Sequence, residues 1–423
     1  MSTERAGQTG ADDLTKTLIN TGDLYRLPKH AISAGAASFT ARTVITMHQR
    51  HRHLRLLLIL AQSLLLVVPG LAGETAQEFR AAAEGYRYHF PRDHGAHDEF
   101  RTEWWYYTGH LTSKDGRPFG YQLTFFRRGM PREQVKTLPS QWSITELYLA
   151  HFAVSDLSKG RFRYAEKISR PGLGKAGANH ERLQVWIDRW SVESPAATPG
   201  TQILSAADSD IAIQLTAAPD KPLVVHGTGG ISRKGTDAGQ ASHYYSFTRL
   251  ATTGTLTIGD ESFEVTGTSW MDHEFGSADL GKDVVGWDWF SLQLDDRREL
   301  MLYRLRRADG SADPVSSGTL IDREGQGHHL AIGDFTLEPT SYWASTTSKA
   351  RYPQRWRLTI PSQQLSLKLN PLMAEQELST TRSTQVIYWE GAIEATGTSQ
   401  GKPVKGQGYM ELTGYAEQFN KKL

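Results

Sequence analysis

The stretches WWYYTGHL (Trp104–Leu111) and WDWFSLQL (Trp287–Leu294) resemble each other and decide the fold. Each is followed by a turn and a second strand-like segment, GYQLTFFRR from Gly120 and LMLYRLRR from Leu300. The two copies are offset by 183 residues in the first strand (287 − 104) and by 180 in the second (300 − 120). An offset this large indicates a duplicated domain rather than a short solenoid repeat. We therefore expect two related β-domains, joined near Gly276–Gly286.

Short segments of alternating apolar and polar residues recur along the chain between turn signals. In one of them Tyr121, Leu123 and Phe125 share a face, as the two-residue period of a strand requires. Asp-Gly at positions 115–116 favours a tight hairpin. Residues 183–192 are predicted as one strand and residues 75–86 as a short helix, but helices of ten or more residues are scarce. The pattern predicts an all-β fold of two tandem β-barrels.

The composition excludes several classes of function. The 47 Lys and Arg residues balance 46 Asp and Glu residues, so the chain lacks the basic excess of nucleic-acid-binding proteins, and we predict no nucleic-acid partner. The chain has no cysteine, which excludes disulfides, thiolate nucleophiles and cysteine–zinc sites. The 42 aromatic residues (11 Trp, 16 Tyr and 15 Phe) and the 39 glycines suit short strands and tight turns. We predict neither a metal site nor a cofactor.

Residues 47–73 have the pattern of a secretory signal peptide. A basic segment begins at Met47, and the apolar run Leu54–Leu71 leads to small residues at which cleavage can occur, before Glu74. The uninterrupted part of the run is short for a membrane span of about 20 residues. The pattern predicts that the protein is exported, to the periplasm or out of the cell. Contact with a membrane is expected only through this segment, if it is not cleaved.

The stretch SWMDHEFG (Ser269–Gly276) is the leading candidate for a functional site. Its three titratable side chains stand among aromatic residues, where burial can tune a carboxyl group for proton transfer beside an apolar ligand. Asp272 would donate the proton, while His273 and Glu274 would orient water. In an extended strand His273 points away from the two carboxylates, so the three converge only if the chain bends, which Gly276 permits.

A structural interpretation of the same cluster is also open. The three side chains could form ion pairs and hydrogen bonds that hold the two domains together, with Arg304 or Arg306 as a partner. Glu103 and Asp288, the carboxylates beside the aromatic residues, are secondary acid or base candidates. Because strands alternate, only half of the nearby aromatic residues can face a cavity, whether it lies inside a barrel or between the two. The predicted ligand-binding residues are Trp104, Trp105, Tyr106, Tyr244, Tyr245, Trp270, Trp287, Asp288, Trp289, Tyr303 and Arg304.

The chain contains five motifs of one known family: EWWYYTGHL (Glu103–Leu111), YYSFTRL (Tyr244–Leu250), SWMDHEFG, GWDWFSLQLDDRRELMLYRLR (Gly286–Arg306) and GYMELTGY (Gly408–Tyr415). Together they resemble the AttH/CrtC family, which contains carotenoid 1,2-hydratases (hydroxyneurosporene synthases) and AttH-like exported proteins often called predicted secreted hydrolases. The resemblance covers about residues 85–416 and implies two lipocalin-like domains, which we place at 85–276 and 277–418. The chain is closer to the AttH-like branch, because Glu274 stands where the hydratases carry Asn.

The resemblance and the acid cluster lead to two functional hypotheses. In the first, the exported protein binds an apolar small molecule and acts as a hydratase-like lyase or a hydrolase through Asp272, His273 and Glu274. In the second, it is a non-catalytic ligand carrier or an accessory component of an ABC-type export or lipoprotein-release system, with the permease complex as partner. A serine hydrolase using Ser399 is a third reading, but its G-x-S-x-G pattern falls in a polar turn.

Overall fold

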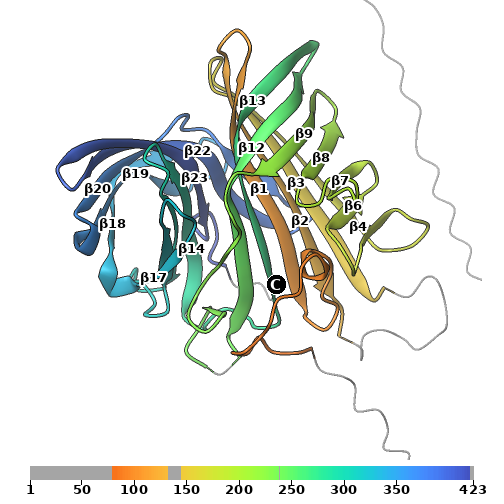
Figure 1. Ribbon diagram of the computed structural model, residues 1–423, viewed down its shortest axis with the longest axis horizontal. Coiled ribbons are helices and arrows are strands. Elements are labelled where there is room, and N and C mark those ends of the chain that lie inside the picture. Colours follow the sequence, from red (N-terminus) through yellow and green to blue (C-terminus); the bar gives the residue numbers. More distant parts are fainter. Residues whose placement is uncertain (1–78, 132–143, 238, 420–423) are drawn as a thin grey trace, which may run out of the picture. The chain divides into compact units, whose positions relative to one another are not determined.

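The computed structural model describes residues 79–131, 144–237 and 239–419, which belong to one compact unit, Ala72–Leu423 (Figure 1). The predicted signal segment lies outside the described residues. Within these ranges the chain forms β-strands and three short 3₁₀ helices, η1 (Arg92–His94), η2 (Ile332–Asp334) and η3 (Pro361–Gln363). No helix in the described ranges is long and apolar enough to cross a membrane. The prediction of an all-β fold is confirmed.

The first sheet has 13 antiparallel strands and ends at Gly276. Its strands are β1 (Thr102–Ser113), β2 (Pro118–Gly129), β3 (Glu146–Asp156), β4 (Arg161–Ser169), β5 (Ala176–Ala178), β6 (Gln184–Ile187), β7 (Trp190–Glu193), β8 (Gln202–Asp208), β9 (Ile211–Pro219), β10 (Val224–Val225), β11 (Ser232–Arg233), β12 (Ala241–Ile258) and β13 (Glu261–Gly276). They follow the order β4-β3-β2-β1-β13-β12-β9-β8-β7-β6-β5, and β10 and β11 pair with β12.

The second sheet has ten antiparallel strands and begins at Val284. Its strands are β14 (Val284–Leu294), β15 (Glu299–Arg307), β16 (Ser317–Ile321), β17 (Gly327–Ala331), β18 (Thr336–Ala344), β19 (Arg351–Ile360), β20 (Leu365–Pro371), β21 (Glu377–Thr380), β22 (Val386–Ser399) and β23 (Lys402–Thr413). They follow the order β17-β16-β15-β14-β23-β22-β20-β19-β18, and β21 pairs with β22.

The two sheets repeat one topology, which confirms the predicted duplication. At the centre of each lies the same succession, β2-β1-β13-β12 in the first and β15-β14-β23-β22 in the second. Tyr106 of β1 lies opposite Thr124 of β2, as Trp289 of β14 lies opposite Tyr303 of β15. The offset of 183 therefore holds for the first strand, but the second is offset by 179 (303 − 124) rather than the predicted 180. A shift of one residue exchanges the two faces of a strand, so the correction decides which side chains point outward.

Each sheet curls around its own apolar core, and Figure 1 shows the second sheet curled on itself. Trp105 and Trp190 are buried inside the first barrel, and Phe290 and Trp356 inside the second. Burying one such side chain contributes about 1.5–3 kcal/mol to folding. The two lipocalin-like barrels implied by the family resemblance are confirmed.

A third apolar cluster joins the outer faces of the two barrels. Tyr106 and Trp270 of the first sheet pack in one cluster with Trp289 and Tyr409 of the second. Gly120 permits the close approach, because a Cβ atom there would lie 2.5 Å from the hydroxyl of Tyr409. The barrels therefore share a packed, largely apolar interface.

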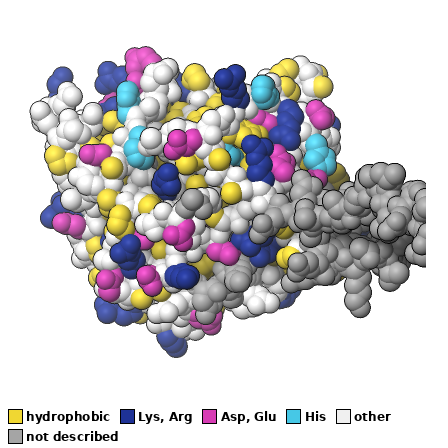
Figure 2. Space-filling view, turned by 90° about the horizontal axis from the view of Figure 1, so that it is seen from below, with side chains coloured by type: hydrophobic (Ala, Val, Ile, Leu, Met, Phe, Trp, Pro, Cys, Tyr) yellow, Lys and Arg dark blue, Asp and Glu magenta, His cyan; other side chains and the backbone are white. Residues whose placement is uncertain are grey.

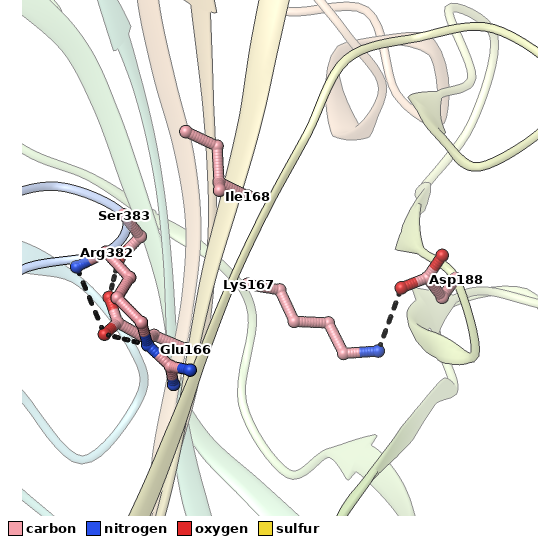
Figure 3. A pocket seen from close by; sticks show the side chains of 6 residues that line it. All are labelled: Glu166, Lys167, Ile168, Asp188, Arg382 and Ser383. Atoms are coloured by element: carbon pink, nitrogen blue, oxygen red, sulfur yellow. Dashed lines mark hydrogen bonds and ion pairs between the residues drawn. The ribbon is translucent and has the colours of Figure 1, made fainter. Parts of the chain in front are cut away.

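Polar contacts supplement this interface. The buried carboxylate of Glu299 on β15 accepts hydrogen bonds from Lys221 and Arg249 of the first domain, each at 2.7 Å. Figure 3 shows Arg382 and Ser383 of the second domain reaching Glu166 on β4, at 3.1 and 2.6 Å. On the face seen in Figure 2, basic and acidic side chains are interspersed, as the balanced composition predicts.

Two local predictions are wrong. Residues 183–192 form two strands, β6 and β7, because the chain reverses at Asp188, whose φ of 54° lies in the left-handed region. The described part of the predicted helix at residues 75–86 contains no helix. There the N–H of Arg80 donates to the carbonyl of Glu99 at 2.7 Å, so the backbone is tied to a distant segment instead of to its own next turn.

Candidate active site

The SWMDHEFG stretch runs straight through β13 without the bend that would bring its three titratable side chains together. Asp272 and Glu274 point out of the first barrel and line a cavity. His273 points the other way, into the barrel, between Met271 and Phe275 of the two apolar clusters there. The alternation of a strand therefore separates His273 from the two carboxylates.

The cavity has a volume of about 690 Å³ and lies between the two barrels, which is one of the two places that the sequence left open for a ligand. Aromatic and apolar side chains make most of its wall, as is usual for a small-molecule site. The predicted site residues that line it are Trp104, Tyr106, Tyr244, Asp272, Glu274, Trp287, Trp289 and Tyr303.

Asp272 is only 3% exposed and accepts three hydrogen bonds from neighbouring side chains. The Tyr244 hydroxyl donates to its Oδ2 at 2.8 Å, the Trp270 indole N–H donates to its Oδ1 at 2.6 Å, and the Ser246 hydroxyl also donates to Oδ1. Burial raises the pKa of Asp272 to about 7, although the three hydrogen bonds oppose that rise. The carboxyl group can therefore hold or release a proton near neutral pH.

A buried histidine, His226, is linked to Asp272 through the Ser246 hydroxyl. His226, between β10 and β11, lies with Nε2 at 2.7 Å from the Ser246 hydroxyl and with Nδ1 at 2.8 Å from the Thr319 hydroxyl of the second barrel. Burial lowers the pKa of His226 to about 3, so its ring is neutral and can donate a hydrogen bond to one of these hydroxyl groups while it accepts one from the other. The second barrel also fixes the position of Tyr244, because the indole N–H of Trp289 donates a hydrogen bond to the Tyr244 hydroxyl at 3.1 Å.

Glu274 has a different environment from Asp272. Its Oε1 lies 2.7 Å from the ammonium group of Lys234 and accepts a hydrogen bond from the Ser242 hydroxyl. Burial alone would lower the pKa of Lys234, but the Glu274 carboxylate raises it above its ordinary value. Two carboxylates two residues apart thus differ: Glu274 belongs to an ion pair, whereas Asp272 has no cationic partner among its hydrogen bonds.

The second barrel contributes two carboxyl groups that the sequence interpretation missed. Glu411 of β23 and Glu390 of β22 lie opposite each other in neighbouring strands and both line the cavity. Glu411 accepts hydrogen bonds from the Trp287 indole and the Thr413 hydroxyl, each at 2.9 Å, and burial raises its pKa to about 7. Burial, and then the nearby Glu411, raise the pKa of Glu390 well above its usual range.

The chain matches the AttH-like family over residues 81–415. It belongs to the AttH-like family. The crystal structure of a putative AttH from Nitrosomonas europaea is 35% identical, with a TM-score of 0.71, over 79% of this chain and 99% of that chain. Kievitone hydratase from Nectria haematococca shares the fold, with 16% identity and a TM-score of 0.61 over 81% of this chain and 97% of that chain. A curated relative, dehydratase asqC of Emericella nidulans, is 22% identical over 272 residues, 62% of this chain and 75% of that protein.

The other predicted site residues of this AttH-like protein do not line the cavity. Trp270 reaches it only through its hydrogen bond to Asp272. Arg304 and Arg306 each lie 2.7 Å from Asp288 in the second barrel, so the suggestion that one of them pairs with the acid cluster is wrong. The residues outside the lining are Trp105, Tyr245, Trp270, His273, Asp288 and Arg304.

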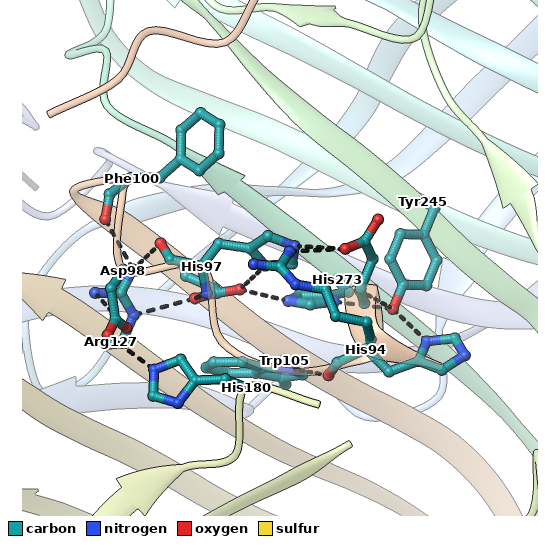
Figure 4. Close-up of polar contacts among 12 residues, drawn as sticks. His94, His97, Asp98, Phe100, Trp105, Arg127, His180, Tyr245 and His273 are labelled. Carbon is teal, nitrogen blue, oxygen red and sulfur yellow. Dashed lines mark hydrogen bonds and ion pairs between the residues drawn. The ribbon is translucent and has the colours of Figure 1, made fainter. Parts of the chain in front are cut away.

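Inside the first barrel of the AttH-like protein, His273 joins a hydrogen-bonded network (Figure 4). Its Nε2 and the Nδ1 of His97 lie 2.8 and 2.7 Å from Oε1 of Glu103, and the Arg127 guanidinium donates to Oε2 at 3.1 Å. Burial would raise the pKa of Glu103, but His97, His273 and Arg127 hold it well below its usual range. Tyr245 extends the network to His94, because its hydroxyl lies 2.9 Å from Nδ1 of His273 and 2.7 Å from Nδ1 of His94.

The same network includes three side chains whose spacing could suit a metal ion. Among the described residues, His97, Glu103 and His273 form the one group whose ligand atoms all lie within 4.8 Å of one another. These atoms hydrogen-bond each other at 2.7 and 2.8 Å, and the guanidinium of Arg127 supplies a fixed positive charge beside Glu103. We therefore interpret the group as a charged hydrogen-bond network that closes the end of the barrel.

The structure does not support the third hypothesis, a serine hydrolase that uses Ser399. Ser399 is the last residue of β22, at the hairpin to β23, and its hydroxyl accepts a hydrogen bond from Arg298 at 2.7 Å. A serine nucleophile of the G-x-S-x-G type needs a turn between a strand and a helix. Ser399 instead ends a strand, and the turn that follows it leads to another strand.

Proposed function

We propose that this AttH-like protein binds an apolar small molecule between its barrels and catalyses the addition of water to it, or the reverse elimination. The observation that carries the proposal is Asp272, a buried carboxyl group in an aromatic cavity whose pKa burial raises to about 7. Two relatives are named for reactions of this class, kievitone hydratase and dehydratase asqC.

In water addition, protonated Asp272 gives its proton to one carbon of a C=C bond, and water adds to the cation at the neighbouring carbon. The oxonium then returns a proton to the Asp272 carboxylate, which restores the acid. In elimination Asp272 protonates a hydroxyl group, the C–O bond breaks, water leaves, and the carboxylate removes a proton from the adjacent carbon. Tyr244 and Ser246 hold the carboxyl group in place by hydrogen bonds, and Ser246 links it to His226.

We further propose that the protein acts after export, on the strength of the segment from Met47 to Gly73. The apolar wall of the cavity also suits a second candidate, in which the protein carries its ligand without turnover. For this candidate we propose an ABC-type export system as the partner, on the family resemblance alone. The two candidates bind the same class of molecule and differ in whether covalent chemistry follows.

The first test is to purify the protein with its native ligand and incubate the complex in H₂¹⁸O. We expect mass spectrometry to detect two co-purifying species whose masses differ by one water, and ¹⁸O in the heavier one, because each cycle of elimination and addition draws water from solvent. Two fragments that share the added water would indicate hydrolysis instead. A ligand that stays unlabelled would favour the carrier and contradict catalysis of water exchange.

The rate of water addition is expected to be constant in acid and to fall as the pH rises through about 7, because only protonated Asp272 can donate and burial raises its pKa to about 7. Glu411, whose pKa burial also raises to about 7, titrates in the same range. The profile should therefore be measured for the wild type and for Glu411→Gln. The fall should persist in the variant, and its disappearance would assign the titration to Glu411.

A further inference from the structure

Among the described residues, Glu390 is the one acidic residue of the cavity with a buried oxygen atom that has no hydrogen-bond partner. Its side chain is only 2% exposed and lines the wall contributed by the second barrel. Oε1 accepts a hydrogen bond from the Tyr106 hydroxyl at 2.7 Å, whereas Oε2 is buried without any hydrogen-bond partner. Leaving a buried polar atom unpaired is costly, so such an atom at a cavity wall marks a place where a ligand supplies the missing partner.

The surroundings of Glu390 decide which kind of partner fits. No basic side chain pairs with it among the described contacts, and Glu411 lies opposite it on β23. Two neighbouring buried carboxyl groups disfavour ionisation of both, and burial raises the pKa of Glu390 well above its usual range. Since Tyr106 donates its hydroxyl proton to Oε1, the acid proton of Glu390 belongs on Oε2. A neutral carboxyl group held in this way is a strong hydrogen-bond donor.

We propose that Glu390 forms a second polar site in the cavity, where its Oε2 hydroxyl donates a hydrogen bond to a carbonyl oxygen of the ligand. This inference rests on the proposed binding of an apolar molecule between the barrels and narrows its class to apolar ketones, aldehydes and esters. Tyr106 connects the two sites, because it lies opposite Asp272 in the sheet and hydrogen-bonds Glu390. Glu390 would orient the carbonyl end of the ligand while Asp272 exchanges the proton.

The test uses two uncharged probes of nearly equal shape, benzophenone and diphenylmethane, which differ by a carbonyl oxygen. Equilibrium dialysis of the full-length protein gives the ratio of their dissociation constants. We expect Glu390→Leu to shift this ratio about tenfold toward diphenylmethane, the effect of one lost hydrogen bond in an apolar site. Binding of diphenylmethane should change little, because leucine keeps the wall apolar.

Two further variants separate a direct contact from a general effect on the fold. Glu390→Gln keeps an N–H donor at the same place and should retain most of the carbonyl preference. Tyr106→Phe removes the partner of Oε1 but leaves Oε2, and it should retain the preference as well. The inference is overturned if the wild type binds both probes equally, or if the preference survives in Glu390→Leu. Probe binding needs no turnover, so this result is independent of whether Asp272 catalyses water exchange.

Discussion

Asp272→Asn is expected to lower the rate of water addition or elimination by about 10²–10⁴-fold, the usual contribution of a positioned acid or base. Asparagine has the shape of aspartate but cannot release and regain a proton in the cycle. The Trp270 indole and the Ser246 hydroxyl can still donate to the amide oxygen, and the amide NH₂ group can donate to the Tyr244 hydroxyl, so the geometry of the wall should persist. The measurement is ¹⁸O incorporation into the co-purified ligand, at equal concentrations of folded protein.

The competing acid for this role is Glu411, which burial tunes to a similar pKa of about 7. We therefore pair the first variant with Glu411→Gln and expect the much larger loss from Asp272→Asn. Asp272 is also linked through Ser246 to the neutral ring of His226, whereas the hydrogen bonds of Glu411 come from Trp287 and Thr413. The reverse order of effects would transfer the catalytic role to the second barrel.

Stability provides the control that the Asp272 variant remains folded. Because burial raises the pKa of Asp272, its contribution to stability is fully present below its unfolded pKa and is lost as the pH rises through about 7. At pH 8 the wild type must keep a buried carboxylate ionised, and asparagine removes that cost. Thermal unfolding at pH 8 should therefore show Asp272→Asn to be at least as stable as the wild type. A large loss of stability would mean that the variant disturbs the interface and not the chemistry alone.

The fold could be predicted because its signals are local and periodic. The repeat of Trp104 and Tyr106 as Trp287 and Trp289 reports the duplication directly, and the alternation of the strands places Asp272 and Glu274 on one face. The sequence could not tell which face, because both faces of the central strands are apolar: one packs inside a barrel, and the other packs against the second barrel. Period alone does not separate two buried faces.

Only part of the candidate site could be predicted from the sequence, because some of its residues carry a local signal and others do not. Glu411 follows Tyr409 and Met410 as Asp272 follows Trp270 and Met271, and it lies opposite Trp289 as Asp272 lies opposite Tyr106. A search for the duplication in the last strand of each domain would have found this counterpart. By contrast, an isolated histidine such as His226 carries no local signal. Its role arises only where a loop of the first barrel meets β16 of the second.

The network at the end of the first barrel shows how the other face of β13 serves the fold. Glu103, His97 and Arg127 are buried almost completely, with 0, 0 and 1% exposure. Burial would lower the pKa of His97, but Glu103 and Asp93 raise it above its ordinary value, so the carboxylate of Glu103 lies between the Arg127 guanidinium and a histidine whose charged form it stabilises. Removing one partner from a buried charge network leaves the others uncompensated.

Glu103→Gln is therefore expected to lower the free energy of unfolding by about 3–5 kcal/mol, measured by urea denaturation at pH 7. The matched control is Asp98→Asn, which removes a 58% exposed partner 3.8 Å from the same arginine and should cost only about 0–1 kcal/mol. Equal losses from the two variants would contradict a special role for the buried charge. Because Glu103 faces the barrel interior and Asp272 the cavity, the rate per folded molecule should stay near that of the wild type. The two faces of β13 would then carry separable properties, stability on one side and proton transfer on the other.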